Sequence, residues 1–336
     1  MNTPVRQGSA DHAAPGRRTR AARRALHGVL LLDKPLRLSS NDALQKAKWL
    51  LRAEKAGHTG TLDPLATGLL PLCFGAATKF AQVSLDADKA YRATLRLGQR
   101  TSTGDLEGQL IDERPVQIDR AMIDAVCARF TGRIEQLPPM HSALKKDGKA
   151  LYEYARAGVA VERTPRPVSI RGIDVVDWQG HSLVLDVRCS KGTYIRTLAE
   201  DIGAALGCGA HLWALRRTAS GPLRLTQATG LAELEALTET QREALLLPPD
   251  VLLADWPLIS LDSLEAARFL TGLRRRVTQA DTSAIRVYGP NATDLLGTAH
   301  IAGGELIADR LLSPLEVQAL GTSAAPAARQ SQASPI

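Results

Sequence analysis

Two segments alternate between apolar and polar residues, as a strand does when one of its faces is buried. In residues 90–98, "AYRATLRLG", every second position from Tyr91 to Leu97 is apolar, and the positions between are Arg or Thr. Residues 182–192, "SLVLDVRCSKG", begin with the same alternation. A period of two residues places successive side chains on opposite faces of a strand. Because one face is polar, the pattern favours an antiparallel or mixed sheet over an all-parallel one.

Other stretches have the spacing of a buried strand or of an amphipathic helix. Residues 28–35, "GVLLLDKP", are a short apolar run ended by Lys-Pro, which is typical of a buried strand. Residues 39–57 then predict a helix with Ser40 or Asn41 as N-cap and Gly57 just beyond its end. Further helical patterns occur at about residues 119–131, 193–206 and 230–245. This mixture predicts an α+β fold, with a mixed, mainly antiparallel sheet flanked by helices.

A change of composition near residue 250 divides the chain. Residues 248–257, "PPDVLLADWP", have the character of a linker, and after them come one helical pattern, "SLEAARFLTG", and three strand-like runs. We therefore expect a large domain over residues 27–250 and a small β-rich domain over residues 255–316. Residues 317–336, rich in Ala, Ser, Gln and Pro, are expected to be disordered.

The charge of the chain is concentrated at its start. The 336 residues carry a formal net charge of +7, and residues 1–26 hold six Arg against one Asp. This arm is expected to be disordered, and it is either a solvated tail or a sequence-independent contact to a polyanion such as nucleic acid. No run of eighteen apolar residues and no secretory signal occurs, which predicts a soluble, cytoplasmic protein without membrane contact.

Residues 138–168 are basic, with Tyr152 and Tyr154 placed between charged residues. Such a segment is either an excursion from the sheet that grips a phosphate backbone or a solvated surface helix. The four cysteines are scattered without a C-x-x-C pair, so neither a zinc site nor a disulfide framework is indicated.

Residues 58–80, "HTGTLDPLATGLLPLCFGAATKF", contain one acidic residue, Asp63. The segment lacks the Lys of a phosphate-binding loop. Asp63-Pro64 could start a turn and cap a following helix. Alternatively, a carboxylate between glycines and an apolar run is a reactive group, which needs a cation or donor nearby. Along the sequence, His58 and Arg196 are the candidate partners.

Five ordered segments between about residues 27 and 220 resemble the TruB family of bacterial tRNA pseudouridine-55 synthases. They are "GVLLLDKP" with "SSNDALQK", "AGHTGTLDPLATGLLPLCFGAATKF", "KAYRATLRLGQRTSTGDLEG", "MHSALKKDGKALYEYARAG" and "CSKGTYIRTLAEDIGAALGCGAHLWALRR". The resemblance implies a pseudouridine synthase fold and an isomerase that converts uridine 55 in the T-loop of tRNA to pseudouridine. It implies no cofactor and no metal.

The resemblance also assigns roles to residues. Asp63 in "TLDP" is the expected nucleophile, which attacks carbon 6 of the base or carbon 1′ of the ribose. Tyr91 is expected to pack on the base and to help remove the proton from carbon 5, and Arg196 to pair with the aspartate. Tyr194, Leu215 and His58 are expected to be, respectively, a substrate contact, an apolar wall of the uracil pocket and a residue that holds the T-loop. A base inside a folded loop must be flipped out to be reached.

The remaining segments acquire expected roles in RNA binding. Residues 138–168 resemble the insertion with which the family grips RNA, and residues near 255–315 resemble its C-terminal PUA-type domain, although the arm of residues 1–26 is no part of the family pattern. The expected partner is tRNA, bound by a monomer that needs no protein partner. Two alternatives remain: a synthase class guided by RNA and protein partners, and a tRNA-folding factor whose catalysis is incidental. Folding and catalysis can also coexist in one protein.

Overall fold

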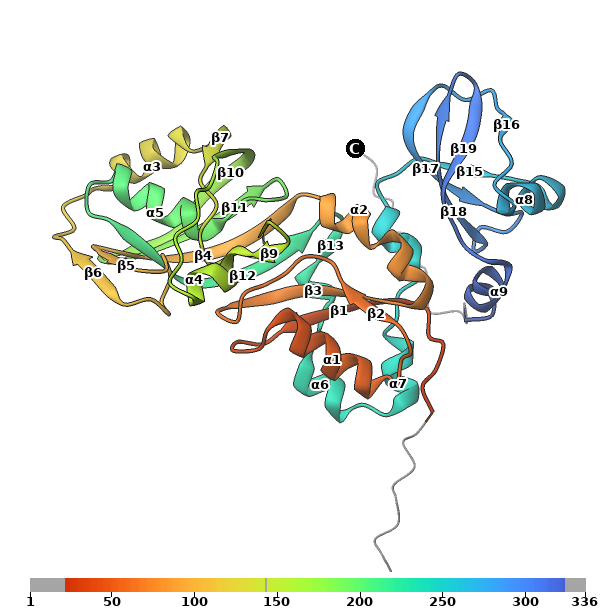
Figure 1. Ribbon diagram of the computed structural model, residues 1–336, viewed down its shortest axis with the longest axis horizontal. Coiled ribbons are helices and arrows are strands. Elements are labelled where there is room, and N and C mark those ends of the chain that lie inside the picture. The colour runs from red at the N-terminus through yellow and green to blue at the C-terminus, as the bar shows by residue number, and fades with distance from the viewer. Residues whose placement is uncertain (1–21, 143, 324–336) are drawn as a thin grey trace, which may run out of the picture.

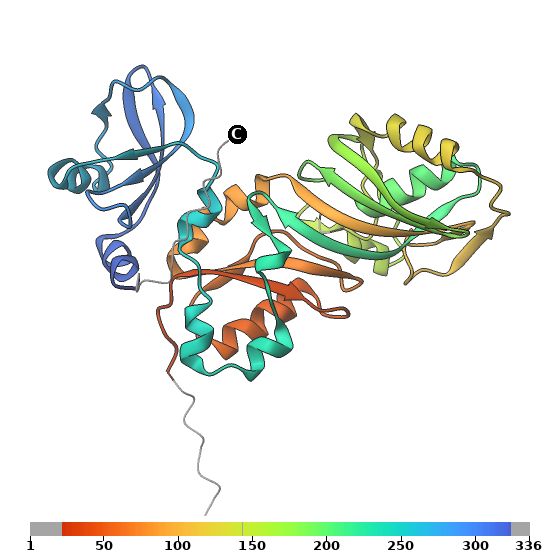
Figure 2. The same cartoon turned by 180° about the vertical axis from the view of Figure 1, so that it is seen from behind.

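The structure is a computed structural model, which describes residues 22–142 and 144–323. The chain forms a long twisted sheet with helices packed on it, followed by a smaller sheet at the C-terminal end (Figures 1 and 2). The expected α+β class is therefore confirmed. Within the described residues, no helix is long and apolar enough to cross a membrane.

The described strands of the main sheet number ten. From edge to edge they run β14 (Thr229–Gly230), β1 (Gly28–Lys34), β3 (Ala66–Phe74), β12 (Ala210–Ser220), β4 (Lys89–Leu97), β11 (Ser182–Cys189), β10 (Arg166–Gln179) and β7 (Gly132–Gln136), with β2 (Ala56–His58) on β3 and β13 (Leu223–Arg224) on β12. The pairs β1–β14 and β3–β12 are parallel, and the others are antiparallel. The sheet is thus mixed and mainly antiparallel, as the alternating segments predicted.

Helices divide the main body into two apolar cores. Helices α1 (Ser40–Leu50) and α6 (Leu231–Ala236) cover the half of the sheet that contains β1 and β3. Helices α3 (Arg120–Arg129) and α5 (Ile195–Ala205) cover the half formed by β4, β11 and β10. The two halves are visible as the centre and the left of Figure 1. The parallel step between β3 and β12 joins them.

Smaller elements connect these layers. They are η1 (Gly75–Phe80), α2 (Ala81–Asp86), β5 (Gln99–Thr101), β6 (Leu110–Glu113), η2 (Leu225–Gln227), α7 (Glu239–Ala244) and η3 (Pro249–Leu253). The helical pattern expected at 230–245 is thus two short helices, α6 and α7, because Leu237 is extended and interrupts it.

The start of α1 differs from the expectation. Its N-cap is Ser39, whose side chain accepts a hydrogen bond from the Asp42 amide, and not Ser40 or Asn41. The helix ends at Leu50, well before Gly57. Ser40 is instead buried and available for a contact with the loop that carries Asp63.

The apolar run after Asp63 forms strand β3, so the interpretation in which Asp63 caps a helix is wrong. Six of the nine residues of β3 belong to one core cluster or another, because both faces of this central strand are covered. The carboxylate therefore lies just before a buried strand.

The segment 138–168 leaves the sheet and returns to it. It contains the short pair β8 (Lys145–Lys146) and β9 (Lys149–Ala150), followed by α4 (Leu151–Arg156). Strand β10 already begins at Arg166, so the last three residues of the expected insertion belong to the sheet.

The C-terminal sheet has the order β15 (Leu258–Ser260), β17 (Thr282–Tyr288), β18 (Leu295–Ala302), β19 (Glu305–Leu311) and β16 (Arg275–Arg276), with α8 (Ser263–Leu270) beside it. It packs on the main body through an apolar cluster that includes Val29, Phe80 and Leu295. The Tyr288 hydroxyl also donates to Asp250 at 2.8 Å.

Parts of the two segments that were expected to be disordered belong to the fold. Helix α9 (Pro314–Ser323) occupies the first residues of the expected tail, because Val317 and Leu320 pack against the core. At the other end, Arg24 is ion-paired to Glu239 and Glu243 at 2.6 and 2.5 Å, so residues 22–26 are a packed part of the fold. Residues 1–21 and 324–336, on which the rest of both expectations falls, lie outside the described residues.

Candidate active site

Asp63 lies in the loop between β2 and β3, and this loop is fastened to the elements around it. The Ser40 hydroxyl accepts from the Leu62 amide at 2.7 Å and donates to the Leu62 carbonyl at 3.0 Å. The Thr59 amide donates to the Pro71 carbonyl at 3.1 Å. Because α1 and β3 both hold the loop, the backbone position from which the Asp63 carboxylate extends is fixed.

A buried arginine holds one oxygen of Asp63. The Arg196 guanidinium, at the start of α5, donates from Nη2 to Asp63 Oδ2 and at 3.2 Å to the His141 carbonyl. Its Nε lies 3.1 Å from Oδ2 of Asp105. The side chains of Arg196 and Asp105 are 8% and 6% exposed, whereas that of Asp63 is 53% exposed. The cation is therefore enclosed, and the carboxylate that it orients is open.

Tyr91 and Leu215 lie where the two apolar cores meet. Tyr91 is on β4 and Leu215 on β12, and both pack against the core beneath α1 and the core beneath α5. Leu215 pairs with Ala66 of β3 and Ala93 of β4. Burial raises the pKa of the Tyr91 phenol, and the nearby Asp63 charge adds to this effect. The pair thus offers an aromatic ring and an aliphatic wall near the carboxylate.

Arg217, which the sequence analysis did not single out, lies opposite Tyr91 across the β12–β4 pair. Its side chain is 1% exposed. Nε donates to the Leu69 carbonyl at 2.7 Å, and Nη2 donates to the Gly60 carbonyl at 3.2 Å. A hydrogen bond to Arg217 counteracts part of the burial effect on the Tyr91 pKa. Within the described residues, no carboxylate forms an ion pair with Arg217.

Gly68 explains how Arg217 can lie so close to β3. Its φ is 98°, in the left-handed region. A Cβ atom there would lie 2.3 Å from the Arg217 carbonyl oxygen, so only glycine lets the two backbones approach.

Tyr194 connects the site to residues 138–168. It is the N-cap residue of α5, and its side chain makes no capping hydrogen bond, while its amide donates to Gln136 Oε1 at 3.0 Å. Burial raises the pKa of the Tyr194 hydroxyl, and Ser142 lies close enough to oppose part of this shift. Together with the His141 carbonyl on Arg196, this contact ties the base of the insertion to the start of α5.

His58 ends strand β2 and is half-buried. Its Nδ1 is buried and has no hydrogen-bond partner among the described residues. Burial, helped by the charge of Arg217, lowers the pKa of the imidazole. His58 is therefore neutral near pH 7 and makes no hydrogen bond to Asp63 in the described part of the chain.

Lys34 and Asp105 were also missed. Lys34 is fully buried, donates to the Pro35 and Leu38 carbonyls at 2.9 and 2.6 Å, and has its pKa lowered by burial to about 8. The "LDKP" and "TGD" segments offered no pattern that marks a reactive site. Of these residues, only Arg217 could have been found from the sequence, because residues 215 and 217 share one face of a strand.

The arrangement is suited to nucleophilic chemistry. A buried guanidinium attracts the carboxylate next to it and fixes its orientation. One oxygen of Asp63 is occupied by Arg196, about half of the side chain is exposed, and Tyr91 lies close enough to be affected by its charge. Such a site can hold a planar base against a carboxylate.

Comparison with known proteins identifies the family to which the chain is similar. A family model described as "TruB family pseudouridylate synthase (N terminal domain)" matches residues 48–195, and "tRNA pseudouridylate synthase B C-terminal domain" matches residues 196–254. A "tRNA pseudouridine synthase B" of Verminephrobacter eiseniae (strain EF01-2) is 59% identical over 90% of this chain and 94% of its own. One of Cupriavidus pinatubonensis (strain JMP 134 / LMG 1197) is 57% identical over 89% of this chain and 98% of its own.

Solved structures share the fold. "Crystal Structure of a Cbf5-Nop10-Gar1 Complex" contains a chain with a TM-score of 0.68 and 25% identity, covering 86% of both chains. "Crystal structure of the archaeal box H/ACA sRNP Nop10-Cbf5 complex" gives 0.67 and 23%, covering 87% of this chain and 88% of the other. Fold and sequence together define a pseudouridylate synthase. Within that class, the chain belongs to the TruB family.

Proposed function

We propose that this chain converts uridine 55 in the T-loop of tRNA to pseudouridine, with Asp63 as the nucleophile. The observation that carries the proposal is the state of Asp63: one oxygen is held by the buried Arg196, while about half of the side chain is exposed at the junction of two cores. The names of the curated relatives support tRNA as the substrate.

The reaction is an isomerisation. The bond from ribose carbon 1′ to nitrogen 1 breaks, the base turns, and a bond from carbon 1′ to carbon 5 forms. Carbon 5 loses a proton and nitrogen 1 gains one, so atoms and electrons balance. Asp63 attacks carbon 6 of the base or carbon 1′ of the ribose, and in either case its release regenerates the carboxylate.

The neighbouring side chains supply the pocket and the proton acceptor. Tyr91 lies against the base and, in its phenolate form, accepts the proton from carbon 5, and Leu215 forms the opposite apolar wall. Tyr194 contacts the flipped nucleotide, and the neutral His58 packs in the T-loop opening. Flipping costs a few kcal/mol of unstacking, which these contacts offset.

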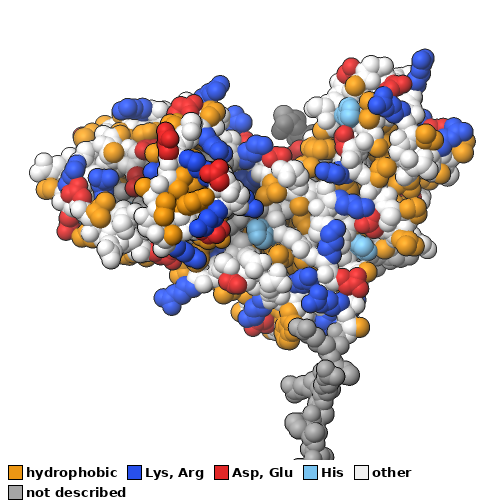
Figure 3. Space-filling view, in the orientation of Figure 1, with side chains coloured by type: hydrophobic (Ala, Val, Ile, Leu, Met, Phe, Trp, Pro, Cys, Tyr) orange, Lys and Arg blue, Asp and Glu red, His pale blue; other side chains and the backbone are white. Residues whose placement is uncertain are grey.

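Two other parts of the chain are assigned to tRNA binding. In residues 138–168, Lys149 and Arg156 lie over the rings of Tyr154 and Tyr152 at 4.9 and 5.2 Å, so cations and aromatic faces are presented together. Lys and Arg side chains gather at the junction between α4 and the central part of the molecule (Figure 3). The C-terminal sheet, which we assign as PUA-like, exposes further arginines, among them Arg274, Arg276 and Arg310.

Replacement of Asp63 by Asn tests the proposal. Asp63→Asn keeps the size of the side chain and removes its nucleophilicity. We expect pseudouridine formation in a tRNA transcript to fall by a factor on the order of 10⁴ or more, with tRNA affinity kept within a few-fold. Asp124→Asn, a matched change on the exposed face of α3, should leave both unchanged. Product formed by Asp63→Asn at the normal rate would overturn the assignment.

The alternative of a guided synthase is tested with the smallest RNA. We propose a monomer that acts in the cytoplasm without protein partners, and such an enzyme isomerises a bare T stem-loop. A requirement for guide RNA or added proteins would favour the guided class, to which the fold is also similar. A folding role coexists with catalysis if Asp63→Asn still speeds the refolding of tRNA.

A further inference from the structure

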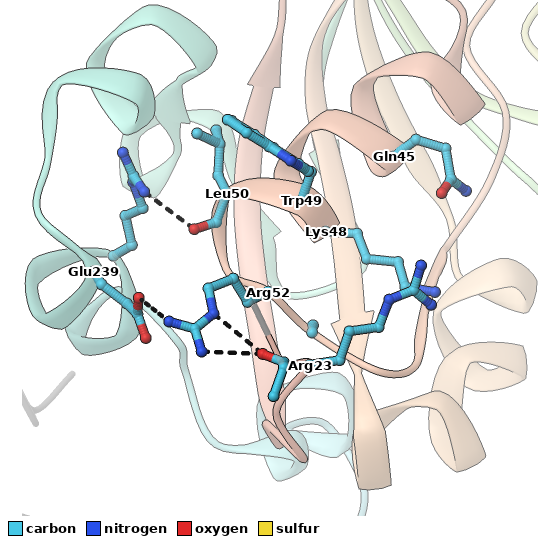
Figure 4. A pocket seen from close by; sticks show the side chains of 10 residues that line it. Arg23, Gln45, Lys48, Trp49, Leu50, Arg52 and Glu239 are labelled. Atoms are coloured by element: carbon cyan, nitrogen blue, oxygen red, sulfur yellow. Dashed lines mark hydrogen bonds and ion pairs between the residues drawn. The ribbon is translucent and has the colours of Figure 1, made fainter. Parts of the chain in front are cut away.

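A second pocket lies at the C-terminal end of α1. Its volume is about 730 Å³. Gln45, Lys48 and Trp49 line it from α1, Arg52 lines it from just beyond the helix, and Arg23 lines it from the N-terminal segment (Figure 4). Residues 45, 48 and 49 share one face of the helix. The pocket is therefore built on the outward face of α1, whose opposite face forms the core with Ala43, Leu44 and Ala47.

The aromatic member of this pocket is open to solvent. The Trp49 side chain is 75% exposed, although tryptophan is among the residue types with the highest average burial. Its indole face is thus available to a flat ligand, and a change at this position removes no core packing.

The cations of the pocket are only partly neutralised. Within the described residues, neither Arg23 nor Lys48 has a carboxylate within 4.0 Å. The acidic lining residue, Glu239, is already engaged by Arg24 at 2.6 Å and Arg52 at 3.1 Å. An anion in the pocket would therefore meet two unpaired cations.

The wall on the N-terminal side is fixed. Arg52 donates from Nε and Nη2 to the Ala22 carbonyl at 3.2 and 3.0 Å, which anchors the chain beside the pocket. Residues 1–21 carry four Arg and one Asp, so their charge has the same sign as that of the pocket. Like charges disfavour this arm as the occupant and favour a polyanion.

Helix α1 connects the pocket with the candidate active site. Ser40, its first residue, binds Leu62 beside Asp63, and the pocket lies at its last turn. Eleven residues at 1.5 Å each give a separation of roughly 16 Å along the helix. A tRNA that inserts one uridine at Asp63 is large enough to cover this distance.

We propose that this pocket is a second RNA-binding site, which takes an unpaired nucleotide of the substrate tRNA with its base on Trp49 and its phosphate between Arg23 and Lys48. Stacking on an aromatic face tolerates any base, and cations bind the backbone without regard to sequence. The choice of tRNA as the ligand rests on the proposed function, whereas the stacking and the charge do not.

The test measures tRNA binding in the Asp63→Asn chain, so that it requires no product and stays interpretable if the assignment of Asp63 fails. We expect Trp49→Ala to weaken binding of a tRNA transcript by roughly ten-fold. Trp49→Phe, which keeps an aromatic face, should recover most of the affinity. Lys48→Gln should lower the slope of log affinity against log salt by about 1. Arg129→Gln, an exposed change on α3, is the matched control and should alter the slope less.

Three outcomes would overturn the proposal. The first is an affinity and a salt slope that Trp49→Ala and Lys48→Gln leave unchanged. The second is an equal loss in Arg129→Gln, which would mean that only the overall charge matters. The third is disappearance of the Trp49→Ala effect when residues 1–21 are deleted, which would identify the arm as the occupant of the pocket. Circular dichroism and thermal melting confirm that each variant is folded.

Discussion

Two buried arginines flank the candidate active site, and they have opposite surroundings. Arg196, on α5, lies between two carboxylates, those of Asp63 and Asp105. Arg217, on β12, faces backbone carbonyls and the Tyr91 phenol, with no carboxylate partner in the described residues. The first arrangement neutralises a cation and orients a nucleophile. The second keeps a cation beside the group that we propose as proton acceptor.

The difference is informative because burial of an unpaired charge is costly. Burial lowers the pKa of Arg217, and the interaction with Tyr91 offsets part of this effect. A protein that needed only packing at this position would be more stable with an apolar side chain. The cation at this position is explained if its electric field stabilises the phenolate of Tyr91. The two arginines should then respond differently to substitution.

Arg196→Gln should have the largest effect. It releases Asp63 and leaves the buried Asp105 without its cation, so we expect a loss of activity on the order of 10³-fold with a loss of stability of about 3–5 kcal/mol. Single-turnover assays and urea unfolding measure the two. Adding Asp105→Asn should restore much of the stability and little of the activity. Recovery of activity in the double variant would show that Arg196 serves only to neutralise Asp105.

Arg217→Met should lower activity by roughly 10²-fold, with a stability change within about 2 kcal/mol, because the lost hydrogen bonds and the removed buried charge oppose one another. Without the cation, the pKa of Tyr91 rises further, so the limb on which the rate rises with pH should move to higher pH. Arg217→Lys should move it less. A lower rate with an unmoved profile would mean that Arg217 only supports the fold.

Lys34→Met should have the smallest effect, on the pH dependence of stability. The folded pKa of Lys34 is about 8, below its unfolded value of about 10.4, so folding releases a proton between these values and stability rises with pH across that window. The variant should lack this part of the rise, on the order of 1 kcal/mol between pH 8 and 10. Urea unfolding at both pH values gives the difference, while Lys89, whose pKa is also about 8, contributes equally to both chains.

Local patterns predicted the local structure and failed at contacts between distant segments. The alternation of residues 90–98 and 182–192 predicted β4 and β11 because a half-buried strand imposes that period on itself. The N-cap of α1 was misplaced because three polar residues in a row can each cap a helix, and the choice depends on the bond from Ser40 to Leu62. Residues 22–26 and 317–323 have the composition of tails, yet ion pairs and an apolar cluster hold them.

The site was predictable as far as motif resemblance reached. Asp63 and Arg196 were named as candidate partners, and the structure joins them directly. Asp105 gave no signal, because a carboxylate in a turn is an ordinary surface pattern, and Arg217 was marked only by its place on the same strand face as Leu215. Their importance comes from burial, which depends on how α5 and β12 pack and is not encoded by the neighbouring residues.

The hydrogen bond from Arg196 to the His141 carbonyl links the base of the insertion, residues 138–168, to the arginine that holds Asp63. Arg196 distributes its donors among Asp63, Asp105 and His141. A shift of residues 141–142 on RNA binding would therefore change how strongly Arg196 binds Asp63. If residues 138–168 bind RNA, as we propose, then by reciprocity an RNA whose binding there strengthens the hold of Arg196 on Asp63 is itself bound more tightly. RNA binding and the reactivity of Asp63 are then thermodynamically coupled through one group, the Arg196 guanidinium.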